Sequence, residues 1–338
     1  MHQADEIKLL AGLNCDAVTV TEDAIVKEAA VVRINLSHPR AVRQLVDVPA
    51  QLSHWGRSPD VYALLLQSTA SDEAAGRAAA VASDGARGQN FAETLKLMWR
   101  LECFAKPLVS LLDGAISPDH VGLTTVGTHR VAGDNFSVAL PRFAPGILPV
   151  AGIAYALSRL AHSRGMEWAL VGRTIDRAEA YAAGLITHCI PDRAFPDIIA
   201  ALADGQPVDP VLDALHEDPE PSHNGLDAEL IARTVGKDNL PAILAALSHE
   251  RAAPREWVDA AAHALTAEPV FASEAVHRLI RMARGMEIRE TLVMSYRLAC
   301  NMQVAAVDKK SSIDALFLKP ENGDLDLPQR SELENGRF

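Results

Sequence analysis

The sequence lacks any close grouping of cysteines. Its cysteines lie far apart, at Cys15, Cys103, Cys189 and Cys300, and no CxxC pair or Cys/His cluster has the spacing of metal ligands. The sequence therefore predicts neither a disulfide framework nor a metal site. A reducing, cytoplasmic location is expected.

Long apolar runs are also missing. None approaches the roughly 18 residues that a membrane-spanning helix needs. The opening segment, MHQADEIKLLAG, has neither the basic start nor the apolar centre of a signal peptide. We therefore expect neither secretion nor membrane insertion.

Positive charge is in short supply. Lys and Arg total 32 against 44 Asp and Glu, which gives a formal net charge of -12. The basic residues are scattered along the chain, which argues against a nucleic-acid-binding surface. A ligand that carries phosphate groups would need a local basic site.

Apolar residues are abundant, and their pattern alternates between strand and helix. The 338 residues are 49% hydrophobic, enough for one large domain with an appendage or for two domains. Residues 29–36 and the nearly continuous apolar run at 61–68 are typical of strands, and residues 41–55 between them have helical spacing. Strand and helix continue to alternate with short connections, which predicts an α/β core with a largely parallel sheet.

The composition changes in the last third of the chain. We predict a core over residues 20–195 and an acidic, proline-rich linker with one short helical segment over 196–225. Amphipathic helices are predicted over 226–318. Residues 319–338 are expected to form an irregular tail.

One helix has an unusually firm predicted start, in the stretch SLLDGAISPDHVGLTTVGTHRVA. Ser117 is a favoured N-cap residue, Pro118 suits the first helical position, and Asp119 suits the first turn. This start follows a buried strand directly. It either serves as scaffold or presents its free N–H groups to a negatively charged ligand.

The order of several segments resembles the crotonase (enoyl-CoA hydratase/isomerase) superfamily, and within it the 3-hydroxyisobutyryl-CoA hydrolase branch. In chain order, these segments are VVRINLSHPRA, SHWGRSPDVYALLLQS, KPLVSLLDG, THRVAGDNFSVALPRFAPGILPVAG, LVGRTIDRAEAYAAGLITH and EPVFASEAVHRLIRMARGMEIRETLVMSYRLACNM. The most specific is GRTIDRAEAYAAGLITH, and the helical segment with MSYRLA distinguishes the hydrolase branch from short hydratases. The resemblance covers residues 29 to 303 approximately.

The resemblance implies an α/β fold, a crotonase-like spiral of ββα units followed by a helical C-terminal segment. It also implies an acyl-CoA as substrate or ligand, with no further cofactor and no metal. The thioester oxygen would lie between two backbone N–H groups, which fall on Val81 and Asp119. The helix that begins near Ser117 would then help to form an oxyanion hole.

The sequence departs from the family at the positions that the chemistry requires. Where the family has a run of glycines, this chain has Pro118, Asp119 and His120, and its loop retains only Asp84 as a match to the family's aspartate. The acid/base positions of the family fall on Gly122, Arg142 and Val150, none of which is a carboxylic acid. A ligand can therefore be retained where turnover is lost.

Several alternatives remain open. The segment 117–119 is either an ordinary helix cap or a ligand contact, and Asp119 with His120 is a weak substitute acid/base pair. Arg142 either grips an anionic group of the ligand or pairs with a nearby carboxylate such as Asp119. The chain is thus either an acyl-CoA hydrolase or hydratase, or a non-catalytic acyl-CoA-binding or protein-interaction member of the family.

Other conspicuous residues are interpreted as structural. Asp113 is expected in a turn, His188 as a hydrogen-bonded structural histidine, and Gly152 at a close packing contact. Tyr296 and Arg297 are expected to pack a helix. The resemblance allows a homo-oligomer, whether dimer, trimer or hexamer.

Overall fold

A computed structural model describes most of the chain. The described residues are 25–36, 49–69, 87–116, 118–140, 152–222, 226–267, 270–305, 312–321 and 323–334. Among the sequence-predicted site residues, Val81, Asp84, Ser117, Arg142 and Val150 lie outside these ranges.

In the part of the chain that the structure describes, the core is a sheet of six strands, and it is largely parallel, as the sequence predicts. Its order is β1 (Ile25–Glu28), β2 (Val31–Asn35), β3 (Ala63–Thr69), β4 (Leu108–Asp113), β6 (His129–Ala132) and β9 (His188–Cys189). Only the edge strand β1 is antiparallel to its neighbour. The apolar run of β3 is buried on both faces: Leu64 and Leu66 face one hydrophobic cluster and Leu65 faces another.

A smaller sheet continues from the end of the large one. It has the order β5 (Ala115–Ile116), β7 (Ser137–Ala139) and β8 (Thr174–Asp176). Gly114, with a φ of 74°, joins β4 to β5 in a backbone conformation that glycine tolerates best. Strands β5 and β7 run parallel, and β8 is antiparallel to β7.

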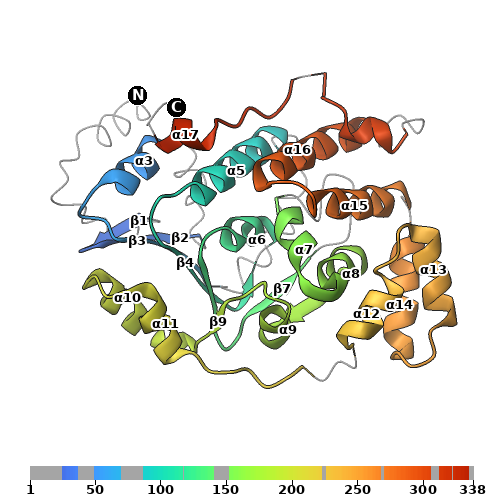
Figure 1. Cartoon of the computed structure of the whole chain (residues 1–338), viewed down its shortest axis with the longest axis horizontal. Coiled ribbons are helices and arrows are strands. Elements are labelled where there is room, and N and C mark those ends of the chain that lie inside the picture. Colours follow the sequence, from blue (N-terminus) through green and yellow to red (C-terminus); the bar gives the residue numbers. More distant parts are fainter. Residues whose placement is uncertain are drawn as a thin grey trace, which may run out of the picture.

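Helices cover both faces of the large sheet (Figure 1). On one face lie α3 (Pro49–Arg57), α5 (Arg87–Glu102) and α6 (Pro118–Thr125), which share a cluster with Leu64 and Leu66. On the other lie α10 (Phe195–Ala203) and α11 (Val208–Leu215), which share a cluster with Leu65. The alternation along β3 thus determines which layer of helices each of its leucines contacts.

Helices α10 and α11 occupy the range 196–225, where the sequence predicts a linker with one short helical segment. Ile198, Leu202 and Leu212 have no exposed surface. Two helices form there because these apolar side chains recur at helical spacing and cover the sheet, although the surrounding prolines and acidic residues are typical of loops.

Further helices lie beside the sheets: three precede α10 in the chain, and those from α12 to α16 form the C-terminal part. They are α7 (Ala154–Arg159), α8 (Arg164–Val171), α9 (Arg177–Ala182), α12 (Ala228–Thr234), α13 (Leu240–His249), α14 (Arg255–Thr266), α15 (Val270–Ala283) and α16 (Ile288–Ala305), with short 3-10 turns at Ala161–Ser163, Asp192–Ala194 and Asp314–Phe317. One hydrophobic cluster runs through α7, α8 and the helices from α12 to α16. Among the described helices, none combines the length and apolar character that crossing a membrane requires.

The C-terminal residues lie against α5 and α16. Residues 323–329 have no regular secondary structure, yet Leu327 is buried and the Trp99 indole N–H donates to the Pro328 carbonyl at 2.8 Å. Asp324 accepts from Arg297 Nε at 3.0 Å. A short helix, α17 (Arg330–Glu334), ends the described chain.

Candidate functional site

The sheet topology brings the sequence-predicted site segments together. Thr69 and Asp113 are paired at the carboxyl ends of the parallel strands β3 and β4. The chain that leaves β3 contains Val81, and the chain that leaves β4 forms β5 and then α6, with Asp119 in its first turn. Both predicted N–H donors therefore lie on segments that follow the ends of neighbouring strands, where ligands of parallel sheets commonly bind.

The third segment leaves the smaller sheet at the same end. Strand β7 is parallel to β5, with Ile116 paired to Val138. Residues 141–150, which carry Arg142 and Val150, follow β7 just as α6 follows β5. The chain segment with Val81, the start of α6 and the segment 141–150 therefore each follow the carboxyl end of a strand.

Helix α6 begins at Pro118, as the sequence predicts. It is held firmly by the core, because Val121, Leu123 and Thr124 are nearly inaccessible to solvent. The N–H groups of the first turn have no partner within a helix and are oriented along the positive end of the helix dipole. A rigid helix start at the end of a buried strand is suited to stabilise a negatively charged oxygen.

Gly122 is buried one turn into this helix. It carries no side chain that could transfer a proton, and its carbonyl accepts from Thr125 Oγ1 at 3.0 Å. The sequence-predicted acid/base position Gly122 therefore contributes only helix backbone here.

A small apolar cavity lies beneath α6. Its lining consists of Leu112, Ile116, Val121, Thr124, Thr125, Arg130, Phe136, Val138, Leu185 and Ile186, and its volume is about 10 Å³. That volume is comparable to one water molecule and is too small for an acyl group. The guanidinium of Arg130 donates from Nε to the Leu185 carbonyl at 2.6 Å and from Nη1 to the Gly127 carbonyl at 3.1 Å, so it is already engaged.

Asp113 has a structural role, as predicted. Its Oδ1 accepts from the backbone N–H of Asn135 at 3.0 Å, which ties the end of β4 to the turn after β6. The turn approaches closely at Gly133, where an added Cβ would lie 2.5 Å from Asp113 Oδ1. The Asp113 carboxylate therefore serves to hold this turn in place.

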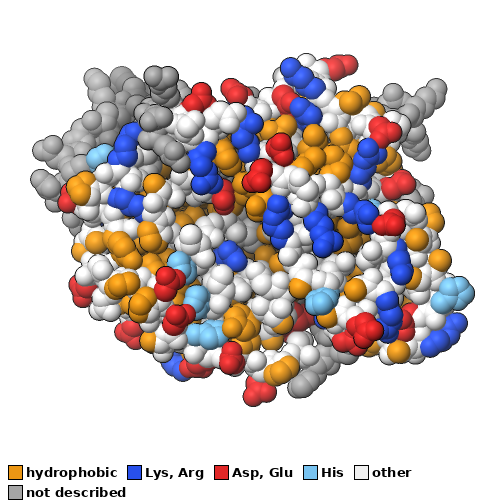
Figure 2. Space-filling view, in the orientation of Figure 1, with side chains coloured by type: hydrophobic (Ala, Val, Ile, Leu, Met, Phe, Trp, Pro, Cys, Tyr) orange, Lys and Arg blue, Asp and Glu red, His pale blue; other side chains and the backbone are white. Residues whose placement is uncertain are grey.

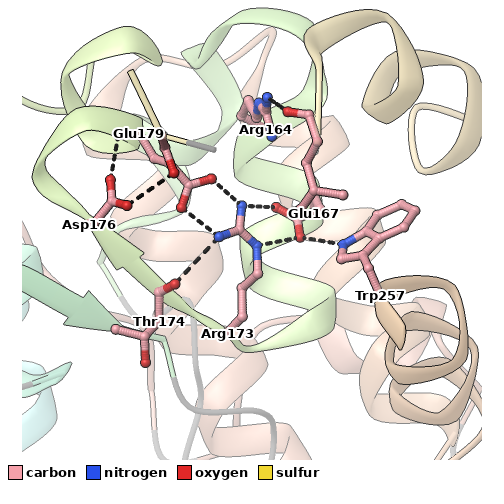
Figure 3. A network of polar contacts seen from close by, with 9 residues as sticks. Arg164, Glu167, Arg173, Thr174, Asp176, Glu179 and Trp257 are labelled. Atoms are coloured by element: carbon pink, nitrogen blue, oxygen red, sulfur yellow. Dashed lines mark hydrogen bonds and ion pairs between the residues drawn. The ribbon is translucent and has the colours of Figure 1, made fainter. Parts of the chain in front are cut away.

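The motif GRTIDRAEAYAAGLITH forms a buried brace (Figure 3). Arg173 donates to Glu167 Oε1 at 2.8 Å and to both oxygens of Glu179 at 2.6 Å, and Trp257 Nε1 donates to Glu167 at 3.1 Å. Burial opposes the charge of Arg173, but the hydrogen bonds that it donates to Glu179 and Glu167 outweigh this effect and raise the pKa of Arg173. The brace joins α8, α9 and α14, so the most family-specific motif supports the fold.

Other sequence-predicted residues also have the structural roles that we expected. His188 contacts Thr187 Oγ1 through Nδ1 and Asp213 Oδ1 through Nε2. Tyr296 packs against a hydrophobic cluster, and Arg297 of the same helix bonds Asp324. Gly152 has a φ of 78°, and a Cβ there would lie 2.5 Å from Met98 Sδ.

The structure reveals groups that the sequence did not single out. Glu167 and Trp257 complete the brace although 90 positions separate them. His129 and His216 lie next to His188. Within the described ranges, no three His, Cys, Asp or Glu side chains are placed to bind one metal ion.

Comparisons with known proteins agree on one family. The family model described as enoyl-CoA hydratase/isomerase matches residues 36–322. A probable 3-hydroxyisobutyryl-CoA hydrolase 2 of Arabidopsis thaliana is 31% identical over 63% of this chain and 58% of its own length. The mitochondrial 3-hydroxyisobutyryl-CoA hydrolase of Xenopus tropicalis is 26% identical over 79% of this chain and 74% of its own.

Two solved structures show the same fold. A carnitinyl-CoA dehydratase from Mycobacterium thermoresistibile has a TM-score of 0.72 at 23% identity and covers 90% of this chain and 98% of its own. An enoyl-CoA hydratase from Rhodobacter sphaeroides has a TM-score of 0.66 at 24% identity over 90% of this chain and 99% of its own.

The chain spans only part of the length of several curated relatives. Its matches to three Arabidopsis thaliana proteins named 3-hydroxyisobutyryl-CoA hydrolases cover 58–60% of their length.

Proposed function

This chain belongs to the enoyl-CoA hydratase/isomerase family and has its crotonase-like fold, and we propose that it binds an acyl-CoA thioester between the backbone N–H groups of Val81 and Asp119. The observation that supports this proposal most directly is the pairing of Thr69 with Asp113. It brings the segments that carry both donors to neighbouring strand ends.

The proposed site would favour negative charge on the thioester oxygen. In this proposal the two amide donors and the start of α6 would face the oxygen, and none of them would have to reorganise when charge develops. Asp119 opposes this effect, because its own carboxylate belongs to the residue that supplies one donor. We therefore propose thioester binding that is weaker than a glycine-rich helix start would permit.

We propose that catalysis is impaired or altered. The family's proton-transfer positions fall on Gly122, Arg142 and Val150, and the loss of a positioned acid or base typically costs about 10²–10⁴ in rate. Arg142 cannot replace the missing group because a guanidinium does not deprotonate in proteins. It could instead bind a phosphate or carboxylate of the ligand, which supports a binding role.

A second candidate function is hydrolysis of an acyl-CoA. The curated relatives of this chain include proteins named 3-hydroxyisobutyryl-CoA hydrolases, and Asp119 and His120 are ionisable residues in the first turn of α6. Neighbouring helical residues diverge by roughly 100°, so they would serve poorly as a pair. In this reading one of them acts alone as the base.

The names of the relatives also suggest the ligand class. We propose a short 3-hydroxyacyl-CoA as ligand, with no additional cofactor and no metal. The oligomeric state is proposed as dimer, trimer or hexamer. A cytoplasmic location remains our proposal from the sequence, and cell fractionation would test it, since several relatives are named mitochondrial proteins.

Titration calorimetry with CoA and 3-hydroxyisobutyryl-CoA tests the binding proposal. We expect saturable binding of the thioester, weaker binding of free CoA, and a loss of about 2–10-fold in affinity when Asp119→Pro removes one donor. Asp119→Ala is the matched control, because it keeps the N–H group and removes only the carboxylate. Equal affinity for the Pro and Ala variants would contradict a role for this amide.

A further inference from the structure

Three histidines form a row on the surface over β9 and α11. The ring centroids of His129 and His188 lie 6.1 Å apart, and those of His188 and His216 lie 5.7 Å apart. Figure 2 shows histidine side chains gathered in this region with acidic side chains beside them. The imidazoles are 13–19% exposed, whereas their aspartate partners are 74–90% exposed.

The row connects the sheet to the chain that leaves it. His129 and His188 begin the parallel strands β6 and β9, at the opposite end of the sheet from the start of α6. Asp209 and Asp213 extend from α11 to these two histidines. His216 immediately follows α11, where the chain turns toward α12 (Figure 1).

Residues 216 and 217 clamp the backbone of the edge strand β9 at Cys189. His216 Nδ1 accepts from the Cys189 N–H at 3.0 Å, and the Glu217 N–H donates to the Cys189 carbonyl at 2.9 Å. Cys189 has no exposed surface, so its N–H group depends on this partner.

The bond from Cys189 requires the neutral tautomer of His216 that has its proton on Nε2. Because Nδ1 accepts a hydrogen bond, the ring proton must be on Nε2, which lies 3.3 Å from Asp218 Oδ1. An imidazolium carries a proton on both nitrogens and can accept no bond. Protonation would therefore turn the 3.0 Å contact into two opposed donors and leave a buried N–H group without a partner.

The neighbouring ring also favours the neutral state. Burial lowers the pKa of His188, Asp213 raises it, and the adjacent His129 and His216 lower it further. A histidine whose folded pKa is depressed stabilises the fold above its unfolded pKa of about 6.5, and that stability is lost as pH falls through the folded pKa.

Charged and titratable groups from several elements lie near the row. They are Asp209 and Asp213 on α11, Asp218 after it, Tyr181 on α9 against His216, the Glu217–Arg193 pair, and Arg177 on α9, whose charge acts on Cys189. The aspartates would attract protonated histidines, but their exposure to water screens such pairs strongly. These aspartates do not replace the acceptor that the buried N–H group of Cys189 loses when His216 is protonated.

We propose that His216 is a proton-operated catch: when neutral it holds residues 216 and 217 against β9, and when protonated it releases them. Asp209 and Asp213 keep α11 in place, so the release is confined to the connection between the core and the C-terminal helices. The connection that follows α11 is thus sensitive to acid, and it lies at the end of the sheet opposite the proposed ligand site.

Hydrogen–deuterium exchange of the full chain tests the catch. Between about pH 7.5 and pH 5.5, after correction for the intrinsic exchange rate, we expect protection of peptides covering 186–192 and 214–222 to fall by about tenfold or more. Peptides of α14 should be unaffected. A fall of less than about twofold in the two clamp peptides would overturn the proposal.

His216→Asn separates the catch from general acid destabilisation. The asparagine carbonyl oxygen can accept from Cys189 near the position of Nδ1 and does not titrate, so the tenfold fall in protection should be lost. His263→Asn, at an exposed position on α14, is the matched control and should retain the wild-type response. If His216→Asn keeps the tenfold fall, the catch does not exist.

A second measurement does not depend on any variant. In protein labelled with ¹⁵N-cysteine, the Cys189 amide resonance should titrate with the same midpoint as the imidazole of His216. A Cys189 amide that is unchanged while His216 is protonated would refute the coupling.

Discussion

Arg173 Nε lies 2.8 Å from Oε1 of Glu167, a carboxylate with no exposed surface. The pair sits between α8 and α14, where Trp257 supplies a second donor to the same oxygen. A buried charge is tolerated only when its partners are complete. The brace therefore makes the attachment of the C-terminal helices sensitive to single substitutions.

Removing the charge of Glu167 should be strongly destabilising. We expect Glu167→Gln to lower the free energy of unfolding by about 3–5 kcal/mol, because Arg173 then keeps only Glu179 as a buried counter-charge. Urea denaturation measures the effect. Arg255→Met, which breaks an exposed pair with Asp259, is the control and should change stability by less than about 1 kcal/mol. Equal effects of the two substitutions would contradict the brace.

Gly133 should tolerate no side chain. In Gly133→Ala the new Cβ would lie 2.5 Å from Asp113 Oδ1, and we expect a loss of about 1–3 kcal/mol in unfolding free energy. Gly285→Ala is the matched control, since its nearest contact would be 3.9 Å from the Met282 carbonyl oxygen. Thermal denaturation of both variants distinguishes the two sites, and a stable Gly133→Ala would argue against the close approach of the turn.

The sequence predicts individual strands and helices better than it predicts the buried contacts between distant helices. The apolar run of β3 and the Ser-Pro-Asp start of α6 are local signals, and both elements form where these signals place them. The contact between Glu167 and Trp257 depends on how α8 and α14 pack, and no local pattern encodes it. The sequence does not predict both helices α10 and α11, because prolines and acidic residues surround the few buried side chains that form their apolar faces.

The thiol of Cys189 should be unreactive in the folded protein. Burial raises its pKa to about 11, with a further contribution from Asp218, while Arg177 lowers it. Its thiolate fraction at about pH 8 is then on the order of 10⁻³. Alkylation followed by mass spectrometry should modify Cys189 only after denaturation. Rapid modification of the native chain at this residue would show that the β9 edge is open.

Restoring carboxylates should restore turnover if the site has lost only its acid and base. We expect the double variant Arg142→Glu, Val150→Asp to release thiol from a 3-hydroxyacyl-CoA about 10²-fold faster or more than the wild type. The matched control, Arg142→Gln with Val150→Asn, introduces polar groups that do not transfer protons and should gain nothing. An equal gain in both variants would point to altered binding.

The most direct measurement follows thiol release by the wild-type chain from a panel of short 3-hydroxyacyl-CoA esters, at enzyme concentrations high enough to saturate the binding seen by calorimetry. We predict saturable binding together with a release rate no greater than that in buffer. Saturable release at the rate of an ordinary enzyme, about 1–10³ per second, would contradict the account, because a competent acid or base would then have to be present at the site.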